Sequence, residues 1–185
     1  MHSRKTAWTL VAFTLMVLTG CESNPPTAEE QRAEAQILSG EVIVAIENFK
    51  MADPTMQAFF DGSYAYAVYP KVAKGAFVVG GAGGEGLVFE EERQIGRSVL
   101  KQGTVGAQIG GQSYSEIIFF KDKAALETFK RGDLQFSAQA SAVAVKVGAS
   151  ADADYESGVA IFTHASGGLM VEASIGGQQF EFWPE

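Results

Sequence analysis

Apolar and polar residues alternate in short segments through most of residues 63–185, and glycines separate these segments. Alternation with a period of two is typical of β-strands that bury one face. Adjacent glycines are poor helix formers and favour the positive φ angles of tight hairpin turns. Gly-Gly pairs lie at 80–81, 83–84, 110–111, 167–168 and 176–177. The pattern therefore predicts many short antiparallel strands joined by close turns.

The first predicted strand covers residues 64–69 and stops at Pro70. A glycine-rich hairpin is expected over residues 77–89. The alternation predicts further strands over 97–102, 105–109, 113–120, 136–148, 149–163, 169–175 and 179–183. Many positions after residue 134 are Ala or Ser, which either allow close backbone approach or leave room for a ligand.

Helical periodicity dominates the region before residue 63. Thr27 and Glu30 form a capping box, and a helix is predicted from there to about Lys50. Its apolar face contains Leu38, Val42, Ala45, Ile46 and Phe49. Because the polar face is mainly acidic, we expect this helix to pack on the body of the domain rather than on a membrane surface.

Two shorter helices are also predicted. Asp53-Pro54 begins one that closes at Gly62, and Asp122 caps another that ends at Gly132. Together these elements predict an α+β fold. We expect an antiparallel β-rich domain, barrel- or sandwich-like, with an N-terminal helical lead-in and one inserted short helix.

The first 21 residues have the pattern of a bacterial lipoprotein precursor. Arg4 and Lys5 precede an apolar run over 7–18, which is too short for a membrane span of about 20 residues. The run ends in Leu18-Thr19-Gly20-Cys21, which resembles a lipobox. Cleavage would leave Cys21 as an acylated N-terminus, and two or more acyl chains anchor a protein stably. Lipoproteins with Asp after the cysteine tend to stay in the inner membrane. Here that residue is Glu22, which favours the outer membrane, facing the periplasm.

This interpretation divides the chain into three parts. Residues 1–20 are a signal peptide, 21–26 a lipidated tether and 27–185 a single domain. Within that domain, 27–62 form the helical lead-in and 63–185 the β-rich body.

The net charge and the single cysteine argue against nucleic-acid binding and against a disulfide-stabilised fold. The net charge is −8, and removing residues 1–20 takes away Arg4 and Lys5 and no acidic residue, which leaves −10. So acidic a domain is a poor general binder of nucleic acid. Cys21 is the only cysteine, so no intramolecular disulfide is possible.

The sequence contains little evidence for a catalytic, metal or cofactor site. The string Gly81-x-Gly83-x-x-Gly86 fits a dinucleotide fingerprint, but strand-like and acidic residues follow it instead of a helix, so a glycine hairpin is preferred.

His164 is the only histidine after the signal peptide, so Cys/His metal sites lack ligands and a Ser-His-Asp triad would have to use this residue. Asp152, Asp154 and Glu156 share one face of a predicted strand, where a solvated face is favoured over a calcium site. We therefore expect no cofactor, no metal and no enzymatic activity.

Basic residues flank the glycine-rich stretch. Lys71 and Lys74 precede it, and Arg93 and Arg97 follow it. Since Lys and Arg pair directly with phosphate, these four residues are the candidate contacts to a lipid headgroup, with scattered surface charge as the alternative.

Several short motifs follow one another along the chain, and most of them are rich in glycine or alanine. They are Tyr66–Pro70, Lys74–Ala76, Gly80–Gly86, Gly103–Gly111, Gln112–Glu116, Ser141–Ala144, Gly148–Ala151, Gly158–Thr163 and Gly167–Gln178. Together they resemble the SYLF lipid-binding domain family, in its bacterial lipoprotein branch, over about residues 53–182. The resemblance implies a compact β-rich domain that binds phospholipid and is not an enzyme. Eukaryotic relatives use a basic N-terminal segment to bind phosphoinositides. Because the matching residues 28–50 are acidic here, that specificity is not transferred.

Two functions remain open from the sequence. The first is a membrane-anchored, periplasm-facing lipoprotein whose domain binds phospholipid. The second is a structural or adaptor envelope lipoprotein that binds a protein or cell-wall partner and uses its lipid only as a tether.

Overall fold

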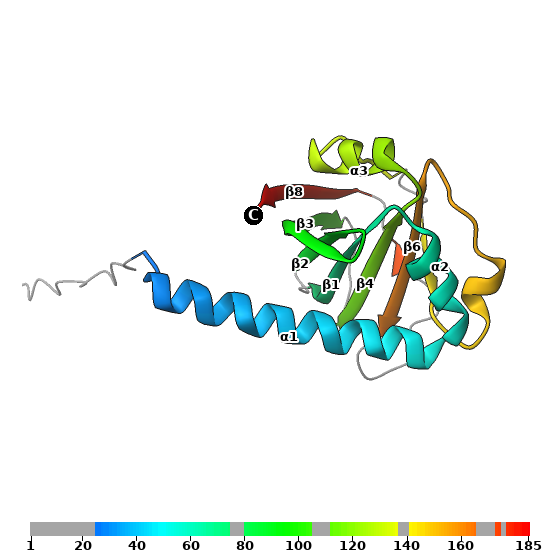
Figure 1. Cartoon of the computed structure of the whole chain (residues 1–185), viewed down its shortest axis with the longest axis horizontal. Helices are drawn as coiled ribbons and strands as arrows, with labels where there is room; N and C mark the ends of the chain where they lie inside the picture. The colour runs from blue at the N-terminus through cyan, green and yellow to red at the C-terminus, as the bar shows by residue number, and fades with distance from the viewer. Residues whose placement is uncertain (1–24, 75–79, 105–111, 137–140, 166–172, 175–176) are drawn as a thin grey trace, which may run out of the picture.

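The computed structural model describes residues 25–74, 80–104, 112–136, 141–165, 173–174 and 177–185. The described residues form three α-helices, two short 3₁₀ helices and eight strands (Figure 1). Helix α1 (Ala28–Ala52) begins at the predicted capping box, since Thr27 and Glu30 exchange hydrogen bonds. The turn η1 (Pro54–Met56) and helix α2 (Gln57–Gly62) follow it. Helix α3 (Lys123–Lys130) begins at the predicted cap Asp122.

The strands lie in one sheet in the order β7-β5-β6-β4-β1-β2-β3-β8. Their bounds are β1 Ala65–Lys74, β2 Gly80–Glu90, β3 Arg93–Thr104, β4 Gln112–Phe120, β5 Ser141–Ala144, β6 Val159–Ala165, β7 Ala173–Ser174 and β8 Gln178–Pro184. The predicted α+β class and the mainly antiparallel pairing are confirmed. The predicted strand over 105–109 lies outside the described residues, as does most of the one over 169–175.

The sheet separates two apolar cores. One face of β1 and β4 carries Tyr69, Tyr114 and Ile118, and this core is closed by Leu126 and Phe129 of α3. The opposite face carries residues such as Val68, Ile117 and Phe119, which pack on α1 and α2. Figure 1 shows α1 crossing the sheet and extending beyond it towards the N-terminus. Both faces of the central strands are therefore buried, whereas the alternating sequence pattern predicted one buried face.

The expectation that β1 would stop at Pro70 is wrong. The strand continues to Lys74, and its register with both neighbours shifts near Pro70. Proline is tolerated at such a bulge because the missing N–H falls where the ladder is already interrupted.

The predicted glycine hairpin over 77–89 is also wrong for its described part. Gly80, Gly81, Gly83, Gly84 and Gly86 all lie inside strand β2. A Cβ on Gly84 would lie 2.6 Å from the backbone oxygen of Lys71, and one on Gly86 would lie 2.7 Å from Cδ1 of Tyr69. These glycines allow close backbone approach to β1, and they do not form a turn.

The turn between β2 and β3 is made by Glu91 and Glu92, in an acidic segment of the sequence. Both residues have positive φ angles, 50° and 63°. A two-residue hairpin with this backbone usually carries Asn-Gly.

The predicted strand over 149–163 is only half correct. Residues Ala149–Asp152 form the 3₁₀ helix η2, and the strand β6 begins at Val159. Strand β6 pairs with β5 in parallel, in contrast to the expected antiparallel series. A parallel pair needs a crossover connection, and residues 145–158 supply it.

Among the helices of the described residues, none has the length and apolar character needed to cross a membrane.

Candidate functional site

A groove of about 580 Å³ lies between α1 and the strands β1 and β4. Its volume is within the range of about 300–1,000 Å³ that is usual for small-molecule sites. Helix α1 contributes Gln36, Ile37, Gly40, Glu41, Val44, Ala45 and Asn48, and the strands contribute Pro70, Lys71, Ser113 and Ser115. One wall is thus helical, and the other is made by strand backbone and small side chains.

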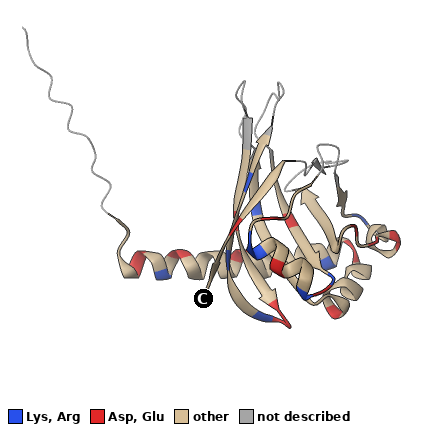
Figure 2. Cartoon of the chain, turned by 90° about the horizontal axis from the view of Figure 1, so that it is seen from above, with Lys and Arg blue, Asp and Glu red and all other residues tan. Residues whose placement is uncertain are grey.

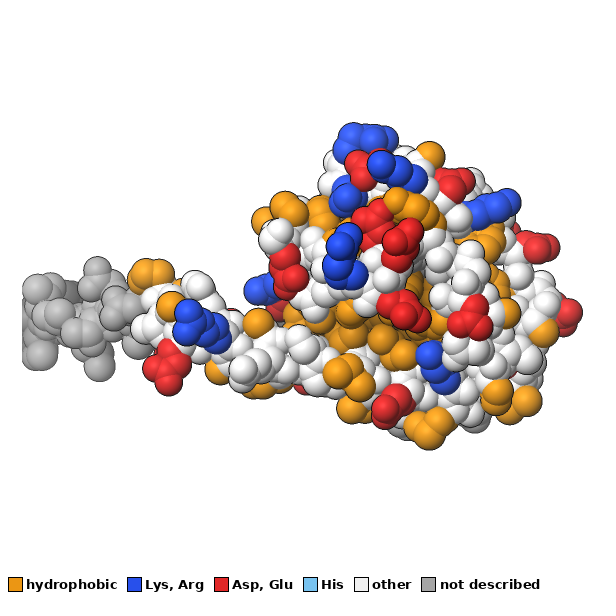
Figure 3. Space-filling view, in the orientation of Figure 1, with side chains coloured by type: hydrophobic (Ala, Val, Ile, Leu, Met, Phe, Trp, Pro, Cys, Tyr) orange, Lys and Arg blue, Asp and Glu red, His pale blue; other side chains and the backbone are white. Residues whose placement is uncertain are grey.

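Helix α1 lines the groove because it carries two apolar stripes. The stripe with Leu38, Val42 and Phe49 is buried against the sheet. A second stripe follows Ile37 and Val44, which stay 62% and 55% exposed. Figure 3 shows hydrophobic side chains exposed along α1 and where it meets the body. Burial of the first stripe therefore leaves the second at the edge of the helix–sheet contact, beside the groove.

Gly40 opens the helical wall of the groove. A Cβ at this position would meet no atom within 4 Å. Although glycine is a poor helix former, α1 runs through Gly40 without a break. Since glycine costs about 1 kcal/mol relative to alanine in a helix, the open space is gained at some expense of stability.

The bulge in β1 forms the opposite wall. Ser115 of β4 donates a hydrogen bond of 2.7 Å to the backbone oxygen of Pro70. This contact fixes the bulge where the strand register shifts, and the exposed side chain of Lys71 follows directly. The groove therefore presents a cation on its strand wall and the carboxylate of Glu41 on its helical wall.

The four predicted headgroup contacts do not gather at one site. Lys71 borders the groove, and the side chain of Lys74 lies outside the described residues. Arg93 pairs with Glu90 in the strand register at the opposite end of β1 from Lys74. Arg97 forms an ion pair with Glu85. Of these candidates, Lys71 borders the groove between α1 and the strands.

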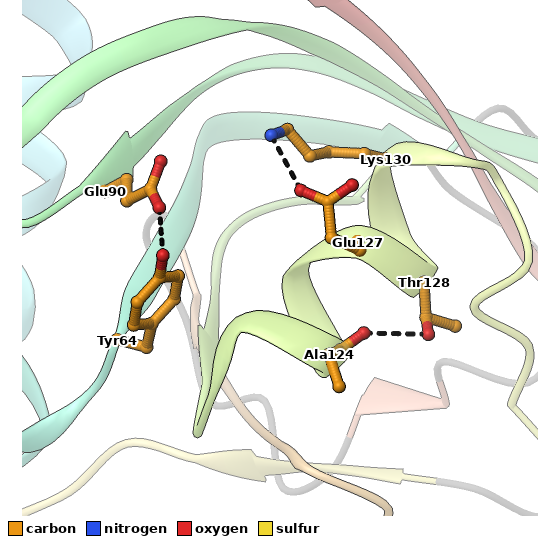
Figure 4. Close-up of polar contacts among 6 residues, drawn as sticks. All are labelled: Tyr64, Glu90, Ala124, Glu127, Thr128 and Lys130. Atoms are coloured by element: carbon orange, nitrogen blue, oxygen red, sulfur yellow. Dashed lines mark hydrogen bonds and ion pairs between the residues drawn. The ribbon is translucent and has the colours of Figure 1, made fainter.

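Most other charges are spread over the surface or paired locally (Figure 2). Lys130 binds Glu127 within α3, and Glu90 accepts a hydrogen bond from the Tyr64 hydroxyl (Figure 4). Glu90, at the end of β2, is therefore held by Tyr64, which lies just before β1.

A second polar cluster is buried on the α3 side of the sheet. Glu116 is fully buried and accepts a hydrogen bond of 3.0 Å from Nε2 of Gln178. Tyr69 donates 2.8 Å to Oγ of Ser98 nearby. Burial raises the pKa of Tyr114 well above its usual range, and the Glu116 carboxylate adds to the rise. Sequence reasoning missed this cluster, although a Glu at an inward position of an alternating strand is a recognisable signal.

The residues weighed for catalysis or metal binding are not brought together. The ring of His164 packs 5.8 Å from that of Phe49, centroid to centroid. Asp152 ends η2, while Asp154 and Glu156 follow in an irregular segment, so the three do not share a strand face. Within the described ranges, no group of three His, Cys, Asp or Glu side chains is placed to hold a metal ion. Cys21 lies outside these ranges.

Comparison with known proteins identifies relatives. Residues 101–182 match the Ysc84 family, described as "Las17-binding protein actin regulator". The chain is also 29% identical over 160 residues to "Beta cell expansion factor A" from Aeromonas veronii. This alignment covers 85% of the chain and 59% of the length of that relative. The family match includes Ser113 and Ser115 of the groove, whereas α1 and β1 precede it.

Proposed function

Because this chain belongs to the Ysc84 (SYLF) domain family, we propose that its folded domain binds phospholipid and catalyses no reaction. The groove between α1 and the β1/β4 strands carries this proposal. It combines exposed apolar side chains, Ile37 and Val44, with a cation, Lys71, as a phospholipid requires.

We further propose that the protein is anchored in the cell envelope through an acylated Cys21. The support is the sequence Leu18-Thr19-Gly20-Cys21 after a short apolar run. With Glu22 after the cysteine, the outer membrane, facing the periplasm, is the proposed location. Helix α1 begins seven residues after Cys21, and residues 25–37 are all exposed. Such a segment would hold the groove close to the bilayer surface without burying α1 in it.

Co-sedimentation with vesicles tests lipid binding. Residues 24–185 contain every described helix and strand and lack Cys21, so any binding belongs to the domain. Vesicles of neutral and of anionic bacterial phospholipids are compared at low and moderate salt. Binding that weakens with salt indicates headgroup contacts, and salt-insensitive binding indicates acyl-chain contacts. If the domain binds no phospholipid under either condition, the proposed function is wrong.

A protein partner is the second candidate. The family description names binding to Las17, a protein, and Ile43 and Met51 of α1 are 59% and 71% exposed outside the groove. In this alternative the acyl chains serve only as a tether. Envelope extract passed over the immobilised domain should then yield one specific partner. Loss of that partner on changing Ile43 and Met51 to Ser would support the adaptor function, and recovery of no partner would exclude it.

A further inference from the structure

Two opposite charges border the groove on different walls. Glu41 lies on α1 and Lys71 on β1, and both line the groove. The ion pairs of the described residues join Arg97 to Glu85, Lys101 to Glu181, Lys130 to Glu127 and Arg131 to Asp133. Glu41 and Lys71 take part in none of these pairs. Both charges are therefore available to a ligand that carries the complementary pair.

Apolar residues line part of the groove beside these charges. Ile37 and Val44 are seven residues apart on α1, which corresponds to about 10 Å along the helix axis. Gly40 lies between them and leaves open space above its backbone. Ala45 and Pro70 complete the apolar lining. Ile37, Gly40 and Val44 form a narrow strip along the helical wall, over which a hydrocarbon chain can lie, and Glu41 stands beside this strip on the same wall.

We propose that the groove selects a zwitterionic phospholipid with a primary amine, of the phosphatidylethanolamine class. Lys71 pairs with its phosphate, and Glu41 accepts hydrogen bonds from its ammonium group. One acyl chain lies over Ile37, Gly40 and Val44. This inference rests on the proposed phospholipid binding and adds the headgroup class and the site.

The charge of the surroundings favours this class over anionic lipids. Helix α1 carries Glu34, Glu41 and Glu47 on its exposed surface, and the chain without residues 1–20 has a net charge of −10. An anionic headgroup would satisfy Lys71 but face the carboxylate of Glu41 at the same site. A choline headgroup has no N–H to donate. Glu41 is the acceptor on the helical wall that a primary ammonium can use.

Filling the groove is the most direct variant. Gly40→Leu places a side chain in the open space between Ile37 and Val44, and leucine is a better helix former than glycine. The variant should therefore fold at least as well as the native chain while it blocks the acyl chain. Gly62→Leu is the matched control, because its Cβ also meets no atom within 4 Å but it lies at the end of α2 and does not line the groove.

Removing one charge at a time separates the two headgroup contacts. Glu41→Gln should abolish the preference for ethanolamine over choline headgroups. Lys71→Gln should weaken binding of both lipids by about tenfold, since a charge-assisted contact to phosphate is lost. Glu47→Gln and Lys121→Gln are the matched controls, because both residues are exposed and neither lines the groove.

The test is isothermal titration of residues 24–185 with short-chain phosphatidylethanolamine, phosphatidylcholine and phosphatidylglycerol, each below its micelle concentration. The expected result is saturable one-to-one binding in which ethanolamine is preferred by at least about fivefold. This binding should be lost in Gly40→Leu and kept in Gly62→Leu. Equal affinity for the three lipids, or unchanged binding by Gly40→Leu, would overturn the groove assignment.

The outcomes for this site and for the proposed function remain distinguishable. Vesicle binding that persists in Gly40→Leu, without headgroup preference, keeps phospholipid binding and rejects this groove. Failure of the native domain to bind any of the lipids, as monomers or vesicles, rejects both. Binding of an extended peptide or of a second copy of the chain, blocked by Gly40→Leu, would assign the groove to a protein and contradict the lipid proposal.

Discussion

Asp53 and Ser150 are 97 positions apart in the chain and are joined by two hydrogen bonds. The carboxylate of Asp53 accepts from the backbone N–H of Ser150 at 2.7 Å and from its hydroxyl at 2.8 Å. It also accepts from the N–H of Gly148 at 3.0 Å and from Thr55. One buried carboxylate thus holds the end of α1 against the η2 crossover.

Replacing this carboxylate should destabilise the fold. Asp53→Ala leaves the buried donors of Ser150 and Gly148 without their acceptor, and each such loss costs about 1–3 kcal/mol. We expect the free energy of unfolding to fall by about 3 kcal/mol or more, measured by urea denaturation. Asp154→Ala, at an exposed position of the same crossover, should change it by less than about 0.5 kcal/mol. Equal effects of the two variants would contradict this role of Asp53.

The same contacts make stability depend on pH. Burial raises the pKa of Asp53, but hydrogen bonds from Thr55, Ser150 and Gly148 outweigh it and hold the pKa well below its usual value of 3.8. A carboxylate with a lowered pKa stabilises the fold above the unfolded-state value, and this contribution is lost as the pH falls below it. The native chain should lose stability steeply below about pH 4. Denaturation of Asp53→Asn over the same pH series should show a shallower acid dependence; identical slopes would refute the assignment.

Replacing a glycine of β2 by alanine should destabilise the fold far more than the same change at an exposed glycine of the neighbouring strand. Gly86→Ala places a Cβ against the backbone oxygen of Val68 and 2.7 Å from Cδ1 of Tyr69, so the β1–β2 ladder must shift. We expect a loss of about 2–3 kcal/mol or failure to fold. Gly103→Ala on β3 meets no atom within 4 Å and should be nearly neutral. Thermal unfolding of both variants measures the difference, and equal melting temperatures would show that the close approach is unimportant.

Substitutions in the Glu91-Glu92 turn should stabilise the fold. Non-glycine residues with positive φ carry a conformational cost of about 1–2 kcal/mol each. Glu91→Asn combined with Glu92→Gly suits the backbone of a primed hairpin turn and should raise the free energy of unfolding by about 1–2 kcal/mol. Glu47→Gly, which replaces an exposed Glu inside α1, should lower it by about 1 kcal/mol. Stabilisation by both changes, or by neither, would argue against backbone strain at this turn.

Local signals in the sequence were sufficient for the starts of helices α1 and α3 and for parts of several strands. The capping box at Thr27 and the cap at Asp122 depend on residues only three positions apart, so the local sequence is enough to specify each cap. The same holds for the apolar stripe from Leu38 to Phe49, because a 3.6-residue period needs no tertiary information.

Tertiary structure decided what these local signals leave open. Glycine permits both a tight turn and a close approach of backbones, and only the position of β1 showed that Gly84 and Gly86 serve the second purpose. Pro70 ends a strand or occupies a bulge, according to whether the neighbours shift register with it. Lys71 borders the groove because that bulge places it opposite α1, whereas Arg97 pairs with Glu85 and Arg93 lies at the start of β3. The sequence by itself therefore determined the starts of α1 and α3, the apolar stripe of α1 and the mainly antiparallel strand pattern. The groove depends on contacts between α1, β1 and β4, which are distant in the chain and meet only when the sheet forms.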